Sequence, residues 1–200
     1  MRIAIIGAGN VGGGLGAALT HAGHTVVFGV RDPDSDKCRL ALREAAGSTA
    51  AHPRDAVTGA DIVVFTLRWD AAAQTVAELP SLEGRIIIDA MNRLGGDPAR
   101  STSQDLAELL PGARVVKAFN TIGFENLTAA RDRRAPAAMF VAGDDAEAKE
   151  VALRLAAELG FRAEDAGPLA NAKPLEEMVK VWLALARRHG RTVGFAISDG

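Results

Sequence analysis

The sequence holds a single cysteine, Cys38, among 200 residues, so no internal disulfide can form, which is typical of a reducing compartment. It also lacks any apolar run of the length that a membrane-spanning helix needs, and the apolar N-terminal stretch ends already at Gly7, too early for a signal peptide. The formal net charge is −2, with both signs mixed along the chain, which argues against a nucleic-acid surface. We therefore expect a soluble cytoplasmic protein that binds neither nucleic acid nor membrane.

Short apolar runs alternate with helical patterns along the whole chain. Many of the runs are continuous and rich in β-branched residues, as in a parallel sheet that helices cover on both faces. This alternation predicts an α/β fold with a doubly wound, mostly parallel sheet. The expected strands are Ile3–Ile6, Thr25–Phe28, Ser48–Ala51, Ile62–Thr66, Arg85–Asp89, Arg114–Phe119, Met139–Ala142 and Phe161–Ala166. The expected helices are Asn10–His21, Asp34–Ala46, Asp70–Glu78, Ser103–Leu110, Asp145–Leu159 and about Leu169–His189.

Three glycines follow the first strand at a characteristic spacing. Gly7, Gly9 and Gly12 match the Gly-x-Gly-x-x-Gly fingerprint of dinucleotide-binding proteins, and they stand between a strand and a helix. In that motif the first glycine makes the tight turn, the second lets the backbone approach a pyrophosphate, and the third lets the helix pack on the sheet. The free N–H groups of the helix then face the phosphates. The alternative is a glycine-rich turn with no ligand, which accounts poorly for the surrounding strand–turn–helix–strand pattern.

The end of the second strand indicates which dinucleotide binds. Arg31 offers a planar, permanently charged group that suits a 2′-phosphate and can also lie over the adenine. Asp32 follows and would repel that phosphate if it pointed inward, and Lys37 on the next helix would help to neutralise the phosphate. We therefore expect NADP rather than NAD. The alternative pairs Arg31 with Asp32 as a surface salt bridge.

Other strand ends should complete the site, because ligands of such sheets bind outside the carboxyl ends of the strands. Those ends carry Asn, Thr, Arg and bulky apolar residues, which suit a flat amphipathic ring. Trp69 could line the pocket or belong to the core. We expect Asp89 to bond backbone between strand ends, and Lys117, inside a strand, to turn to an edge or to solvent.

No residue has the pattern of a catalytic acid or base. The chain has no tyrosine, which excludes the Tyr-x-x-x-Lys proton donor of short-chain dehydrogenases. None of the four histidines is expected at the carboxyl end of a strand, and no pair has metal-ligand spacing. We therefore predict no catalytic side chain and no metal site.

A series of segments resembles a known family in the same order along the chain. The segments are Gly9–Gly12, Gly29–Arg31, Thr66–Trp69, Lys117–Thr121, Gly143–Asp145 and Asp165–Leu169. Through them, over nearly all 200 residues, the chain resembles the coenzyme F420-dependent NADP oxidoreductases, which act on a deazaflavin, and their bacterial dinucleotide-binding relatives. It differs from the F420 enzyme's pattern at Val30, Asp32, Arg68 and Asn120, so the identity of the hydride acceptor stays open.

The resemblance implies a Rossmann domain with a small C-terminal α/β extension, in a homodimer. The order of the elements favours a boundary near Pro136, between residues 1–135 and 136–200, and a single domain stays open as the alternative. The apolar segment Thr192–Ile197 could be a last strand or an arm over the partner subunit. The implied NADP(H) contacts, with those of the fingerprint, are Gly7, Gly9, Asn10, Val11, Gly12, Arg31, Lys37, Leu67, Arg68 and Asn92. The implied contacts to the acceptor are Trp69, Met91, Asn120, Thr121, Ile122 and Leu169.

The expected activity is hydride transfer between NADP(H) and a deazaflavin (F420) or flavin. Such a reaction needs orientation and exclusion of water more than side-chain acids, since the cofactors carry the chemistry. Two alternatives stay open: a reductase of a small imine or carbonyl compound, and a non-catalytic NADP(H) sensor. Reductases of the first kind add a long all-helical domain, whereas only one long helix follows the sheet here.

Overall fold

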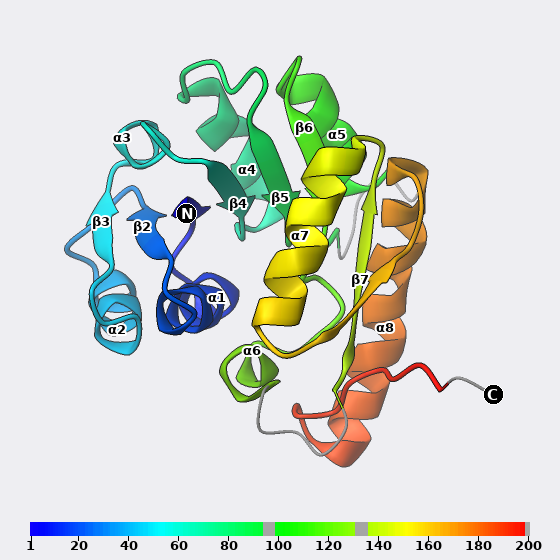
Figure 1. The fold of residues 1–200 in the computed structure, drawn as a ribbon. Coiled ribbons are helices and arrows are strands. Elements are labelled where there is room, and N and C mark those ends of the chain that lie inside the picture. Colours follow the sequence, from blue (N-terminus) through cyan, green and yellow to red (C-terminus); the bar gives the residue numbers. More distant parts are fainter. Residues whose placement is uncertain (94–98, 131–135, 199–200) are drawn as a thin grey trace.

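The apolar runs of the sequence form one eight-stranded sheet. The computed structural model describes residues 1–93, 99–130 and 136–198, and the strands stand in the order β3-β2-β1-β4-β5-β6-β7-β8 (Figure 1). The strands are β1 (Arg2–Ile6), β2 (Thr25–Gly29), β3 (Thr49–Ala51), β4 (Ile62–Phe65), β5 (Ile86–Asp89), β6 (Arg114–Lys117), β7 (Ala138–Gly143) and β8 (Arg162–Asp165). Neighbouring strands are parallel except β6 and β7, which are antiparallel. The predicted mostly parallel, doubly wound sheet is confirmed.

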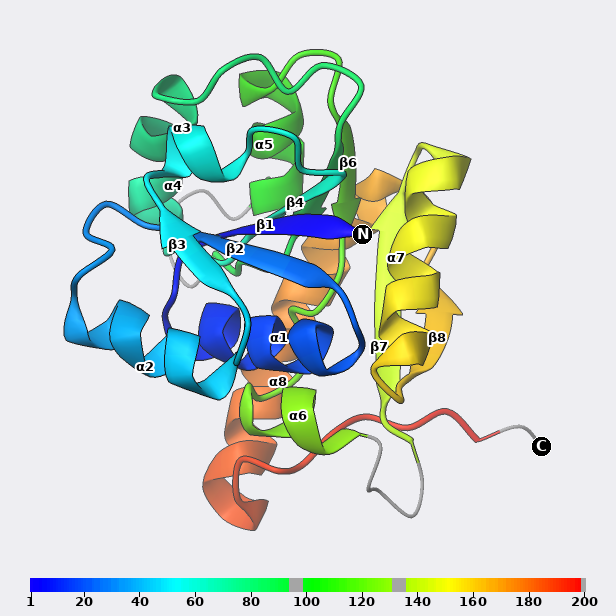
Figure 2. The same cartoon turned by 60° about the vertical axis from the view of Figure 1, so that its left-hand side comes forward.

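Helices cover both faces of this sheet, as Figure 2 shows. The helices are α1 (Asn10–His21), α2 (Asp36–Glu44), α3 (Pro53–Ala56), α4 (Trp69–Ala77), α5 (Thr102–Leu109), α6 (Glu125–Ala129), α7 (Ala146–Glu158) and α8 (Ala172–His189), with a 3-10 turn, η2, at Leu169–Asn171. Successive residues of a strand point to opposite faces, so β1 sends Ile3 and Ile5 to the core beneath α1 and α7, and Ala4 and Ile6 to the core beneath α4 and α5. Both faces are buried, which is why the strands are continuously apolar.

Two short helices, α3 and α6, were not predicted. They have four and five residues, too few to show a helical period in the sequence. The other helices lie where the sequence placed them, within a few residues at the ends. Among the described residues, no helix combines the length and apolar character needed to cross a bilayer.

The C-terminal part continues the same sheet. β7 pairs with β6, and one core cluster includes side chains from both parts of the chain. The boundary expected between residues 135 and 136 lies at the end of a stretch outside the described residues, and the division into two domains stays a prediction.

The segment Thr192–Ile197 forms no strand. It folds back on its own chain as an extended strap, in which Val193 C=O accepts from Trp182 Nε1 (2.9 Å) and Phe195 C=O accepts from Ala138 N–H (2.8 Å). Figure 1 shows this strap crossing the lower end of α8 and β7.

Candidate functional site

The glycine motif forms a tight turn at the carboxyl end of β1. Gly7 has φ +111°, a conformation that side-chain-bearing residues rarely adopt. A Cβ on Gly12 would lie 2.1 Å from Gly7 O and 2.7 Å from Thr66 Oγ1, so only glycine allows α1 to approach the turn this closely. Thr66, just after β4, donates its hydroxyl hydrogen toward Ile6 O (3.0 Å) and Gly7 O (3.2 Å). The turn is thereby fixed between β1 and β4.

The start of α1 is open to an anion. A Cβ on Gly9 would meet no atom within 4 Å, so there is free space above the backbone at the helix N-terminus. No side chain caps this terminus, and its first turn contains no acidic residue. Its backbone N–H groups and the positive end of the helix dipole are therefore available to a pyrophosphate. Asn10 and Val11 supply the first N–H groups of the helix.

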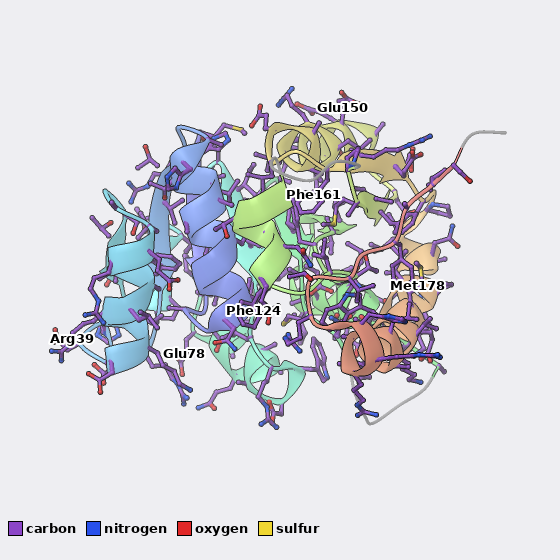
Figure 3. The ribbon with its side chains drawn as sticks, turned by 90° about the horizontal axis from the view of Figure 1, so that it is seen from below. Arg39, Glu78, Phe124, Glu150, Phe161 and Met178 are labelled. Carbon is purple, nitrogen blue, oxygen red and sulfur yellow. The ribbon has the colours of Figure 1, made fainter. Side chains whose placement is uncertain are left out.

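The larger of the two hollows described here, about 910 Å³, begins at this turn. The end of the hollow at the glycine turn is lined by Gly9, Asn10, Val11 and Thr66. Lys37 of α2 also lines the hollow. From there it runs along the outer side of α1 as far as Leu159. Figure 3 shows α1 lying between α2 and α6, with Phe124 beside α6. Only the end at the glycine turn is positioned for a dinucleotide, because the remainder lies away from the strand ends.

A second hollow of about 460 Å³ contains Arg31. Its lining residues are Arg31, His52, Pro53, Arg54, Ala77 and Glu78. Lys37 is not among them and lines the larger hollow instead, so the joint binding of one phosphate by Arg31 and Lys37 stays a prediction. Among the described residues no ion pair joins Arg31 to Asp32, whose Oδ1 instead accepts from Asp34 N–H (3.0 Å).

His52 corrects one expectation about the histidines. It follows directly on β3, at the carboxyl edge of the sheet, whereas the sequence placed no histidine at such a position. The sequence placed the end of this strand correctly at Ala51, so the position of His52 could have been recognised and was overlooked.

The loop after β4 carries the residues expected near the nicotinamide. Leu67 is partly buried, and Arg68 is exposed and pairs with Asp70 at 2.8 Å. Trp69 begins α4 and is partly buried against the core, with the Arg93 guanidinium 4.7 Å from its ring centre. Trp69 therefore packs in part on the core, and its contact with the acceptor stays a prediction.

The ends of β5 and β6 are joined by two asparagines. Asn92 Nδ2 donates to Asn120 O (3.1 Å), and Asn120 Nδ2 lies 3.0 Å from both Asn92 Oδ1 and Leu175 O of α8. The preceding residue, Phe119, has φ +60°, a strained conformation for a bulky residue. The amide pair fixes this loop against α8.

Two buried oxygen atoms in this loop have no hydrogen-bond partner within the described structure. They are Asn120 Oδ1 and Thr121 Oγ1, in side chains that are 3% and 2% exposed. Such groups are costly unless a ligand or water satisfies them. Of the other residues expected at the acceptor, Met91 and Leu169 are buried in one core cluster and Ile122 in the other, and their contact with an acceptor stays a prediction.

Lys117 contradicts its prediction, because it is fully buried rather than turned to an edge or to solvent. Its ammonium group lies 3.0 Å from Asp89 Oδ2 and 2.8 Å from Glu176 Oε1, and donates to Met91 O at 2.6 Å. Thr102 also bonds this cluster, with Oγ1 2.9 Å from the Lys117 ammonium. A buried ammonium needs such partners, since desolvation without them is very costly.

Asp89 makes the expected hydrogen bond to the backbone and also bonds a side chain. Its Oδ1 accepts from Met91 N–H (2.9 Å), which shapes the strand end, while Oδ2 accepts from Ser103 Oγ (2.6 Å). The sequence missed Glu176, Thr102 and Ser103 altogether. Within the described ranges, no group of three or more His, Cys, Asp or Glu residues could hold a metal ion.

The chain is similar in sequence to known NADP-dependent reductases and metalloreductases. The family model described as "NADP oxidoreductase coenzyme F420-dependent" matches residues 2–93. The F420-dependent NADP reductase of Methanothermobacter marburgensis is 28% identical, over all of this chain and 99% of its own length. Metalloreductase STEAP3 of Rattus norvegicus is also 28% identical over 88% of this chain, which spans only 36% of that protein.

The likeness to one of the similar solved structures extends over the whole chain. The crystal structure of a proposed F420-dependent NADP reductase from Arthrobacter sp. FB24 superimposes with a TM-score of 0.88, at 28% identity and full coverage of both chains. The match includes β7, β8 and α8, so the likeness extends beyond the nucleotide-binding half.

Proposed function

Since this chain belongs to the family of coenzyme F420-dependent NADP oxidoreductases, we propose that it transfers a hydride reversibly between NADP(H) and a deazaflavin or flavin-type acceptor. The observation that carries the proposal is the uncapped start of α1 above Gly9, where free backbone N–H groups and open space meet at the carboxyl edge of the sheet. A pyrophosphate fits this geometry and a bulky side chain at residue 9 would fill it.

The residues that would hold the nucleotide follow the sheet edge. Gly9, Asn10 and Val11 would bind the pyrophosphate, Arg31 the adenosine end, and Leu67 the nicotinamide end, because they follow β1, β2 and β4 in turn. Bound NADPH supplies a hydride from its nicotinamide ring. The chain contributes binding and orientation of the two ring systems.

The acceptor would lie against the β5 and β6 ends. Asn92 and Asn120 hold each other and Leu175 in place, so the wall is preorganised before a ring binds. The unpartnered oxygens of Asn120 and Thr121 would accept hydrogen bonds from N–H or O–H groups of the acceptor. The apolar side chains of Met91, Ile122 and Leu169 would exclude water from the same region.

No acid or base of this chain is required for the hydride step. The carboxylates closest to the acceptor wall, Asp89 and Glu176, already accept hydrogen bonds from Lys117 and Thr102 and are fixed in the core. The chain's role in this proposal is therefore to hold two rings in contact, which lowers the entropic part of the barrier.

Stopped-flow mixing tests the proposal. The NADPH-loaded protein is mixed in separate runs with F420, FMN, FAD and a small cyclic imine, and loss of NADPH absorbance is followed. We expect fast oxidation by F420 or a flavin and none by the imine. Oxidation by the imine alone would instead identify an imine reductase. Tight NADPH binding without oxidation by any acceptor would identify a nucleotide sensor.

The homodimer and the cytoplasmic location stay predictions that depend on the family resemblance. Sedimentation velocity of the purified chain, with and without NADPH, tests the dimer directly. The strap at Thr192–Ile197 is held by its own subunit in this structure, so a dimer formed without exchange of this segment is the simpler expectation.

A further inference from the structure

We propose that His52 and Arg54, at the start of α3, bind the 2′-phosphate of NADP(H) together with Arg31 and set the preference of this chain for NADP over NAD. The inference rests on the proposed nucleotide site, and it adds two residues from a part of the sheet that the glycine motif does not reach. The hollow in which all three side chains meet is the observation behind it.

The strand order brings these residues to one edge. β3, β2 and β1 are parallel neighbours, and Gly29 pairs with Ala51 across β2 and β3. Val30 N–H donates to Ala51 O (2.9 Å), so the chain leaves both strands side by side just before Arg31 and His52. Gly7 N–H donates to Gly29 O (3.0 Å), which places the glycine turn beside the end of β2, at the same edge of the sheet.

A dinucleotide held at this row has a defined direction. Its pyrophosphate sits over the β1 turn, its nicotinamide half extends over β4 and β5, and its adenosine half extends over β2. The ribose 2′ position then lies between the β2 end and the β3 end. This is where the hollow of about 460 Å³ opens, within the size range of ligand sites.

The charge of the hollow suits a phosphate. Arg31, His52 and Arg54 are exposed, and in the described part of the chain none of these three side chains has a hydrogen-bond or ion-pair partner. The backbone carbonyl of Arg54 accepts a hydrogen bond from Thr58 Oγ1 (3.3 Å), which leaves its guanidinium group uninvolved. Guanidinium groups bind phosphate through paired, charge-assisted hydrogen bonds, so two of them with a histidine form a strong acceptor site for it.

The neighbouring side chains that could compete do not. Asp32, next to Arg31, does not line the hollow, and its Oδ1 accepts a hydrogen bond from the Asp34 N–H (3.0 Å). Lys37 faces the larger hollow beside Gly9, so the 2′-phosphate would have to be neutralised by other cations. Glu78 at the end of α4 is the one acidic residue lining the Arg31 hollow and would weaken phosphate binding there.

Equilibrium binding of NADPH and NADH tests the inference. His52→Gln and Arg54→Gln should each weaken NADPH binding by about tenfold, the loss of one charge-assisted contact, and change NADH binding by less than about twofold. Glu78→Gln should strengthen NADPH binding and leave NADH binding unchanged. All three side chains are exposed, so the fold should tolerate the changes.

Arg154→Gln is the matched control, because it removes an exposed positive charge on α7, outside both hollows. It should change neither affinity. Equal loss of NADPH and NADH binding in the His52 and Arg54 variants, or no loss at all, would overturn the inference. With either of these outcomes, the proposed function would still hold if the wild-type chain bound NADPH and passed its hydride to an acceptor. If the wild-type chain failed to bind NADPH, the proposed function itself would fail.

Discussion

The ammonium group of Lys117 lies 2.8 Å from Glu176 Oε1, and neither side chain has any exposed surface. Lys117 is the last residue of β6 and Glu176 lies in the first turns of α8, so the pair fastens the long C-terminal helix to the sheet. Asp89 of β5 joins the same ammonium group from the neighbouring strand. Through this contact α8 brings Leu175 O to Asn120, which links the buried charges to the proposed acceptor wall.

Replacing Lys117 by methionine should destabilise the protein by about 3–5 kcal/mol, because it leaves Asp89 and Glu176 buried without their cation. Urea denaturation followed by circular dichroism measures the change. Lys149→Met is the control, since Lys149 pairs with the half-exposed Asp165 and should cost about 1 kcal/mol or less. Adding Glu176→Gln to Lys117→Met should recover part of the loss, and fully additive effects would contradict a coupled pair.

Substitutions at Gly9 and Gly12 should have different effects, on NADPH binding in the first case and on stability in the second. Gly9→Ala should leave the free energy of unfolding within about 0.5 kcal/mol, since its Cβ meets nothing within 4 Å, but weaken NADPH binding at least about tenfold. Gly12→Ala should lower stability by about 1–3 kcal/mol or more, since its Cβ would lie 2.1 Å from Gly7 O. Thermal unfolding and NADPH titration of both variants test this. A Gly9→Ala protein that bound NADPH normally would contradict the pyrophosphate site.

The fold was predictable because its signals are local. A β-branched run predicts a buried strand, and the Gly7 and Gly12 spacing predicts a particular turn, each within a few residues. The buried charge cluster was not predictable in this way. Lys117 lies 28 residues from Asp89 and 59 residues from Glu176 in the chain. A charge inside a strand suggests exposure until the partner is known, and only the folded structure shows that partner.

The hollow around Arg31 was missed in part for a related reason. The sequence indicated Arg31 from its place at the end of a clear strand, and it placed the end of β3 correctly at Ala51, but α3 has four residues and shows no helical period. His52 could therefore have been placed at the sheet edge in advance and was overlooked, whereas the sequence did not show that Arg54 lines the same hollow. Lys37 was assigned from its distance along the chain; in the structure it lines the other hollow, and its contact with the phosphate stays a prediction.

The single cysteine should be unreactive in the folded protein. Burial raises the pKa of the Cys38 thiol, and the nearby carboxylates of Asp32 and Asp34 raise it further, so less of the reactive thiolate is present at a given pH. Alkylation by iodoacetamide should be much slower in buffer than in urea. In the folded protein the alkylation rate should also begin to rise at a higher pH than in the unfolded chain. Equal rates in both conditions would show that α2 does not shield the thiol.

Thr121→Val should separate stability from activity at the acceptor wall. The Thr121 hydroxyl is buried without a partner in the described structure, so a methyl group in its place should leave stability unchanged or raise it by up to about 1 kcal/mol. If that hydroxyl binds the acceptor, kcat/KM for the acceptor should fall about tenfold while the Kd of NADPH stays the same.

Thr20→Val provides the matched control for this variant. The Thr20 hydroxyl on α1 is also buried without a partner among the described residues, but it lies near the end of the helix remote from the glycine turn. The same exchange there should have a similar small effect on stability and none on kinetics. A Thr121→Val protein with unaltered acceptor kinetics would remove Thr121 from the site, whereas a loss of stability would show that the hydroxyl has a structural partner.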